Sequence, residues 1–93
     1  MITVIIPTAL RNFTARKAEI EAQGETVREV LADLNQQYPD LKPHLYQDGE
    51  LRSFVNVFVG DRNIKKLKGL DTPLKDGDSL MLVPAIAGGA GEP

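Results

Sequence analysis

The sequence contains no cysteine and a single histidine, and this scarcity excludes most active-site chemistry. Without cysteine the chain has no disulfide, no thiolate metal site, no iron–sulfur cluster and no cysteine nucleophile. His44 cannot build a metal site alone, and no glycine-rich phosphate-binding motif occurs. Groups for proton transfer are also scarce. We therefore expect a protein that is not an enzyme and that binds neither a metal nor a cofactor of its own.

The chain also lacks an excess of positive charge and any long apolar run. Lysine and arginine number 11 against 13 aspartates and glutamates, which gives a formal net charge of −2. Nucleic acid is therefore not an expected partner, because phosphate binding needs a basic surface. No segment reads as membrane-spanning, and Met1 to Pro7 does not have the pattern of a secretory signal. We expect one cytoplasmic domain from these 93 residues.

Two strands are predicted before residue 25. Ile2 to Ile6 is a β-branched run that Pro7 closes, as is typical of a strand. Residues 14–22 alternate weakly between polar and apolar side chains, which favours an edge strand. We expect this second strand to pair antiparallel with the first across a loop at residues 9–13.

One amphipathic helix is predicted to begin at Thr26. Thr26 and Glu29 fit a capping box, in which each side chain accepts a hydrogen bond from the backbone N–H of the other residue. A single apolar stripe follows at helical spacing and comprises Val27, Val30, Leu31, Leu34 and Tyr38. Pro39 ends the helix, and residues 40–52 are predicted to be a loop.

The rest of the chain predicts three more strands and two turns. The strands are expected at residues 54–59, 63–64 and 79–83, and the turns at residues 67–70 and 76–78. Pro84 is expected to end regular pairing. Two strands, one helix and further strands in this order predict an α+β fold, in which the helix packs on one face of one sheet. The order is compatible with a β-grasp.

Alternation along the strands predicts which side chains face the helix. The positions expected in the core are Val4, Ile6, Val55, Val57, Val59, Leu80 and Leu82. The opposite face is more apolar than a sheet face open to solvent should be. Its apolar members are Ile5, Pro7, Phe58, Met81 and Val83, which we interpret as a partner-docking patch. The alternative is that residues 40–52 or a second subunit cover this face.

A basic cluster follows the strand predicted at residues 54–59. It comprises Arg62, Lys65, Lys66 and Lys68. Most clusters of this kind are solvated surface. The alternative is contact with an acidic patch on a partner.

The last predicted strand leads toward a diglycine, Gly88-Gly89. Glycine has no Cβ, so two in succession make a thin, flexible strip of backbone. Such a strip can enter a narrow active site and present a carboxylate there. The alternative is an inert flexible end. On this basis we expect residues 1–87 to form one domain and residues 88–93 to form a flexible tail.

The chain resembles the ThiS/MoaD sulfur-carrier family of ubiquitin-like β-grasp proteins over nearly its whole length to Gly89. The segments that carry the resemblance are residues 2–8, 26–34, 54–56, 74–80 and 84–89. The most specific combination is Asp76-Gly77-Asp78 before a final strand that ends in Pro-x-x-x-Gly-Gly. Within the family, residues 6–8 and 84–89 are most similar to CysO-type carriers of cysteine synthesis.

The resemblance implies a mixed sheet of four to five strands with the first and last strands pairing in parallel at its centre. It also implies an E1-like adenylyltransferase that uses ATP to adenylate the Gly89 carboxylate, and sulfur transfer that gives a thiocarboxylate. A sulfur-accepting synthase then consumes this group in biosynthesis of the cysteine, thiamine or molybdopterin type. The carrier supplies no catalytic side chain, and Gly88 and Gly89 deliver the tail.

Four residues follow Gly89, which therefore has no free carboxylate in this sequence. Some relatives carry short extensions that a zinc-dependent JAMM-type metallopeptidase trims, so the resemblance implies a precursor cleaved between Gly89 and Ala90. The alternative is that residues 90–93 are simply an end and that Gly89 is not used. Two rival functions also remain. One is a ubiquitin-like modifier conjugated through Gly89 to lysines of other proteins, and the other is a β-grasp binding module with an inert tail.

Overall fold

The computed structural model describes residues 1–84. The predicted tail at residues 88–93 lies outside the described residues, and so do Gly88, Gly89 and Ala90. Within residues 1–84, no helix is long and apolar enough to cross a membrane.

Five strands form one mixed sheet in the order β2-β1-β7-β5-β6. They are β1 (Ile2–Ile5), β2 (Glu19–Ala22), β5 (Val55–Val59), β6 (Arg62–Asn63) and β7 (Ser79–Pro84). The first and last strands lie side by side and run parallel, with Val4 opposite Leu80. The remaining pairs are antiparallel. This confirms the α+β class and the central parallel pair that the resemblance implied.

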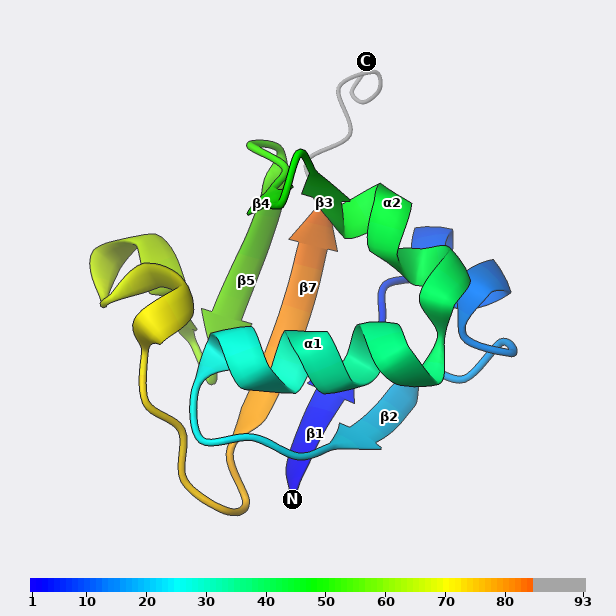
Figure 1. Cartoon of the computed structure of the whole chain (residues 1–93). Helices are drawn as coiled ribbons and strands as arrows, with labels where there is room; N and C mark the ends of the chain where they lie inside the picture. Colours follow the sequence, from blue (N-terminus) through cyan, green and yellow to red (C-terminus); the bar gives the residue numbers. More distant parts are fainter. Residues whose placement is uncertain (85–93) are drawn as a thin grey trace.

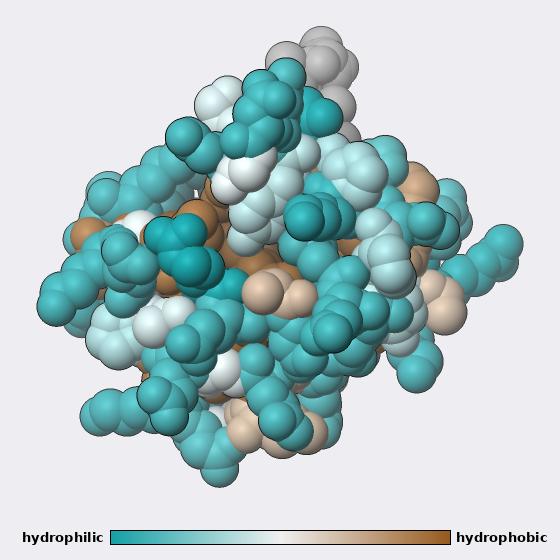
Figure 2. Space-filling model, viewed as in Figure 1, coloured by the Kyte–Doolittle hydropathy of each residue, from teal (hydrophilic) through white to brown (hydrophobic). Residues whose placement is uncertain are grey.

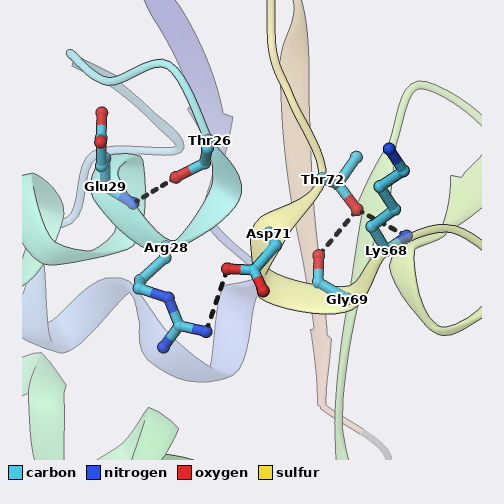
Figure 3. Close-up of polar contacts among 7 residues, drawn as sticks. All are labelled: Thr26, Arg28, Glu29, Lys68, Gly69, Asp71 and Thr72. Carbon is cyan, nitrogen blue, oxygen red and sulfur yellow. Dashed lines mark hydrogen bonds and ion pairs between the residues drawn. The ribbon is translucent and has the colours of Figure 1, made fainter.

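The helix α1 (Val27–Gln37) crosses one face of this sheet (Figure 1). It begins where predicted, because the Thr26 hydroxyl accepts a hydrogen bond from the backbone N–H of Glu29 at 3.2 Å (Figure 3). The second half of the predicted capping box is displaced by one residue. The Glu29 carboxylate accepts from the backbone N–H of Glu25 at 2.9 Å, rather than from that of Thr26.

The core lies between α1 and the sheet, as the alternation of side chains predicted. The fully or almost fully buried residues include Val4, Ile6, Val27, Val30, Leu31, Leu34, Val55, Val57, Leu80 and Leu82. Val59, which was also expected in the core, is only partly buried and packs against its margin. Burying one side chain of this size contributes about 1.5–3 kcal/mol to the free energy of unfolding, so the interface between α1 and the sheet is a large source of hydrophobic stabilisation.

The second strand is shorter than predicted. Residues 8–13 form a 3-10 helix, η1 (Thr8–Phe13), where a loop was expected, and residues 14–17 form a turn. The hydroxyl of Thr14 donates to the carbonyl of Lys17 at 3.1 Å, and Ala15 and Arg16 both have positive φ. A strand cannot contain two successive left-handed residues, so regular pairing begins only at Glu19.

The prediction of a loop at residues 40–52 is wrong. This segment holds the end of a 3-10 helix η2 (Pro39–Leu41), a short helix α2 (Lys42–Leu45), and the strands β3 (Tyr46–Gln47) and β4 (Glu50–Leu51). Asp48 and Gly49 link the two strands with positive φ at both residues, which is the signature of a type I′ hairpin turn. Leu41 and Leu45 are fully buried, so the segment closes the core beyond the end of α1.

The connection between β6 and β7 contains two 3-10 helices, η3 (Ile64–Lys66) and η4 (Gly69–Asp71), in agreement with the tight turn expected there. The Thr72 hydroxyl donates to the carbonyl of Gly69 at 2.7 Å and accepts from the backbone N–H of Lys68 at 3.1 Å (Figure 3). An ion pair of 3.3 Å between Arg28 and Asp71 links this connection to the start of α1. The predicted short strand at residues 63–64 begins one residue earlier, at Arg62.

The last strand extends one residue past its predicted end at Val83. Pro84 lies opposite Val55, the first residue of β5, in the ladder between β7 and β5. Pro84 is also the last described residue, so the expectation that it ends regular pairing stays a prediction.

Gly24 is predicted to be a position that only glycine fills without loss of stability. A Cβ added there would lie 2.7 Å from the backbone nitrogen of Val30 and 2.8 Å from the Cβ of Glu29. Since α1 would have to move, Gly24→Ala should lower the free energy of unfolding by about 1–3 kcal/mol in chemical denaturation. The exposed neighbour Gln23 provides the control, because Gln23→Ala should change it by less than about 0.5 kcal/mol. Equal stability of Gly24→Ala and the wild type would contradict the close packing.

Candidate partner-docking face

The sheet face opposite α1, which we call the docking face, carries a row of side chains that runs across all five strands. We call its three central members, Ile5, Met81 and Phe58, the apolar row. The register places Glu19 beside Ile5, Ile5 beside Met81, Met81 beside Phe58, and Phe58 beside Asn63. Residues paired in this way point to the same side of the sheet. The row therefore runs from a carboxylate on β2, through three apolar side chains, to an amide on β6.

The apolar centre of this face is accessible. The side chains of Met81 and Val83 are 38% and 37% exposed, whereas Leu80 and Leu82 between and beside them are buried against α1. Ile5, Pro7 and Phe58 are half-buried. The structure thus brings together the five residues predicted as a patch: four lie on the strands, and Pro7 follows the end of β1.

A groove with a volume of about 500 Å³ extends this face toward the end of β7. Its walls are formed by Ile5, Pro7 and Ala9 on one side and by Met81, Val83 and Pro84 on the other. Arg11 also lines it, and the Nε–H of Arg11 donates to the carbonyl of Ile6 at 3.0 Å. Pro84, the last described residue, is among the residues that line this groove.

Residues 40–52 do not cover this face. Leu41 and Leu45 point into the core, and the ring of His44 stacks on Phe13 with centroids 4.0 Å apart. His44 also lines a separate hollow with Leu10, Pro43, Arg52, Phe54 and Pro84. One of the two alternative covers suggested by the sequence is therefore wrong. The other, a second subunit, is a question for solution measurements.

The α1 side of the molecule is different in character. Figure 2 shows it as mainly hydrophilic, with hydrophobic atoms at the bottom of a hollow above α1. A hollow of about 360 Å³ on this side is lined by Arg28, Asn35, Lys42 and Tyr46 among others. Burial raises the pKa of the Tyr46 hydroxyl, and the nearby Arg28 cation opposes this rise. Within residues 1–84 there is no group of three or more metal-ligating side chains.

Sequence reasoning missed several residues that border the docking face. Thr8, Ala9 and Arg11 line the groove because η1 folds back beside the end of β1, a path that no sequence signal indicated. Asn63 also lies on this face, and its amide donates to the side-chain oxygen of Asn56 at 3.3 Å. Alternation along residues 54–59 had already placed Asn56 on this face, whereas the predicted strand at residues 63–64 was too short for alternation to place Asn63.

A mixed sheet with a central parallel pair and one helix packed on one face defines a ubiquitin-like β-grasp protein (Figure 1). The chain belongs to the ThiS family, whose model matches residues 4–89. It is 38% identical over 91 residues to the sulfur carrier protein CysO of Mycobacterium tuberculosis, covering 95% of this chain and 98% of that protein.

Two further similarities bear on function. The crystal structure of the Amycolatopsis orientalis BexX/CysO complex contains a chain that matches with a TM-score of 0.89 at 39% identity, covering 96% of this chain and all of that one (100%). The small archaeal modifier protein 3 of Haloferax volcanii is 41% identical over 64 residues, which is 69% of this chain and 70% of that protein. The first similarity is to a carrier crystallised with a partner, and the second is to a modifier.

The free face is predicted to contribute little to folding. Met81→Ser should lower the free energy of unfolding by only about 1 kcal/mol, because Met81 is partly exposed and packs mainly on its cross-strand neighbours Ile5 and Phe58. Leu82→Ala, one position along the same strand, should cost about 2–5 kcal/mol, because Leu82 is buried. Urea unfolding of the two variants compares them directly. A comparable loss in both would mean that the free face is covered in solution.

Proposed function

We propose that this chain is a sulfur carrier of the CysO type, which bears sulfur as a thiocarboxylate on Gly89 after residues 90–93 have been removed. The observation that carries the proposal is the position of β7. This strand is held by β1 on one side and by β5 on the other, and it leads directly toward the diglycine. The carrier body is thus suited to position a carboxylate that another enzyme activates.

The docking face gives independent support to the proposal. The exposed Met81 and Val83 lie on the same strand that leads to the tail, and Pro84 is among the residues that line the groove beside them. Four residues, 85–88, separate Pro84 from Gly89, and the five Cα-to-Cα steps between these two residues span at most about 18 Å when extended. A partner bound on this face can therefore have its active site within reach of Gly89.

The proposed chemistry needs no catalytic side chain of the carrier. One oxygen of the Gly89 carboxylate attacks the α-phosphorus of ATP in an E1-like adenylyltransferase, and pyrophosphate leaves with the electrons of the broken phosphoanhydride bond. Hydrosulfide then attacks the carbonyl carbon and expels AMP. Loss of the thioacid proton gives the thiocarboxylate, from which a sulfur-accepting synthase takes the sulfur.

Removal of residues 90–93 is a required first step in this proposal. Gly89 is joined to Ala90 in the sequence, so no carboxylate exists at Gly89 until water cleaves this peptide bond. A zinc-dependent peptidase of the JAMM type is the proposed agent. Metal-bound water supplies the nucleophile in such enzymes.

A second function is favoured by one specific similarity. The 41% identity to the small archaeal modifier protein 3 of Haloferax volcanii supports conjugation of Gly89 to lysines of other proteins. Both functions begin with the same adenylate and differ in the nucleophile, which is sulfur in the carrier and a lysine amine in the modifier. Longer and more complete similarity to CysO proteins favours the carrier.

Activation at Gly89 is tested with the chain ending at Gly89, the genome's E1-like enzyme, ATP and sulfide. Intact mass should report replacement of one oxygen by sulfur. The full-length chain should stay unmodified, since its Gly89 has no carboxylate. Gly89→Val in the shortened chain should react much more slowly, because a branched side chain obstructs entry into a narrow site. Lysine-linked adducts in place of the thiocarboxylate would favour the modifier, and an unmodified shortened chain would refute both.

Docking through the free face is tested separately with Phe58→Asp. A carboxylate at the centre of the apolar row should weaken binding to the activating enzyme by tenfold or more, because binding would bury an unpaired charge against apolar surface. A tenfold change corresponds to about 1.4 kcal/mol of binding free energy. Gln36→Glu is the control, because it makes the same change in net charge at an exposed position on α1, on the other side of the sheet. Circular dichroism verifies that both variants fold. Unchanged binding by a folded Phe58→Asp variant would mean that the docking surface lies elsewhere.

A further inference from the structure

A hollow of about 370 Å³ opens at the β6 end of the docking face and takes no part in the chemistry proposed above. It is lined by Phe58, Asp61, Arg62, Asn63, Lys66 and Leu67. Phe58 also belongs to the apolar row, so the hollow is continuous with the docking face. Leu67 is 37% exposed, so it adds apolar surface at the edge of the hollow.

Two cations line the hollow, Arg62 and Lys66, and Lys65 and Lys68 lie in the same stretch of sequence. We use the term basic rim for these four residues. All four side chains are exposed, and none of them forms an ion pair with another residue in the part of the chain that the structure describes. Lys65 makes only a 3.5 Å contact with the carbonyl of Ser53.

The charge of the basic rim contrasts with the rest of the molecule. The chain as a whole carries a net charge of −2, and the opposite end of the cross-sheet row is occupied by Glu19 on β2. None of the four cations is neutralised by an ion pair within the described residues, so all four are available to a carboxylate on a partner. An exposed leucine beside them adds apolar surface that the monomer does not bury.

We infer that the basic rim and Leu67 form a second half of the docking face, which receives acidic side chains flanking an apolar residue on the surface of a partner protein. The inference rests on the proposed function, since the partner is the enzyme that activates Gly89. The apolar row would supply contact area, and the basic rim would set the orientation in which the partner docks. Complementary charge at the margin of an interface acts mainly on the rate of association and on the choice of partner.

A protein partner fits these observations better than nucleic acid or a second copy. A nucleic-acid site needs a basic surface along several phosphates, and here four cations lie beside Asp61 on an acidic protein. The five-stranded face is about 24 Å wide and about 13 Å long, or roughly 300 Å², from ordinary strand spacing and rise. A stable dimer buries about 800 Å² per partner. A partner that also holds the tail gains the remaining area.

The test is the association rate of the full-length chain with the E1-like adenylyltransferase of the same genome, measured by biolayer interferometry at several salt concentrations. The double substitution Arg62→Glu and Lys66→Glu reverses the two cations that line the hollow. It should slow association about tenfold at low salt, where the Debye length is about 30 Å, and the difference should vanish near 1 M salt, where it is about 3 Å.

The matched control is Lys42→Glu with Lys75→Glu. It makes the same change in net charge at two exposed lysines, one on α2 and one in the turn before β7. The control should associate at close to the wild-type rate. Leu67→Ala should leave the association rate unchanged and speed dissociation several-fold, because an apolar contact acts after encounter.

Equal slowing of association by the double substitution and by its control would overturn the inference, because the change in net charge alone would then explain the effect. The inference also fails if the double substitution leaves association unchanged while abolishing retention on an RNA column. If the wild-type chain binds the adenylyltransferase neither at full length nor when it ends at Gly89, both the inference and the proposed function fail. Normal wild-type binding with no effect of the basic rim overturns the inference alone.

Discussion

The parallel pairing of β1 with β7 is the constraint on which the rest of the structure depends. These strands come from opposite ends of the described chain, and their pairing brings Val4 and Leu80 together under α1. A parallel pair cannot be joined by a tight turn, so the chain between the two strands must include a crossover, and α1 is the helix of that crossover. The helix fills one face, and the connections leave the other face open.

That open face follows from the same geometry. Once α1 covers one side, the alternate residues of β1, β5 and β7 must point the other way, and in this chain several of them are apolar. Alternation along β7 therefore explains both sets of residues. It buries Leu80 and Leu82 and exposes Met81 and Val83. The proposed docking surface adds no element to the fold and uses the reverse side of its most central one.

The sequence was sufficient to predict the elements whose signals are local. The Thr26 cap, the apolar stripe of α1 and the alternation around Leu80 each depend on a few neighbouring residues. Each was confirmed except at the end of the stripe, because Tyr38 lies just after α1 and is only partly buried. The segment at residues 40–52 was mispredicted because its strands are two residues long, too short for a periodic signal. The Asp48-Gly49 pair was the available clue, since both residues adopt the positive φ of a hairpin turn.

The candidate site was predictable in part for the same reason. Alternation alone placed Ile5, Phe58 and Met81 on one face, but their order in a single row depends on the register between strands distant in sequence. The hollow near Leu67 depends on how η3 turns back toward β5, and no pattern in the sequence specifies this. Gly88, Gly89 and Ala90 remain predictions from the sequence and the resemblance.

The double support of β7 also has a mechanical consequence. If a partner were to pull on Pro84 along the axis of β7, the ladder with β5 at residues 80–84 and the ladder with β1 at residues 79–81 would both be loaded in shear. Hydrogen bonds loaded in this way share the force rather than opening one after another. The body of the protein would then resist tension applied at its last described residue.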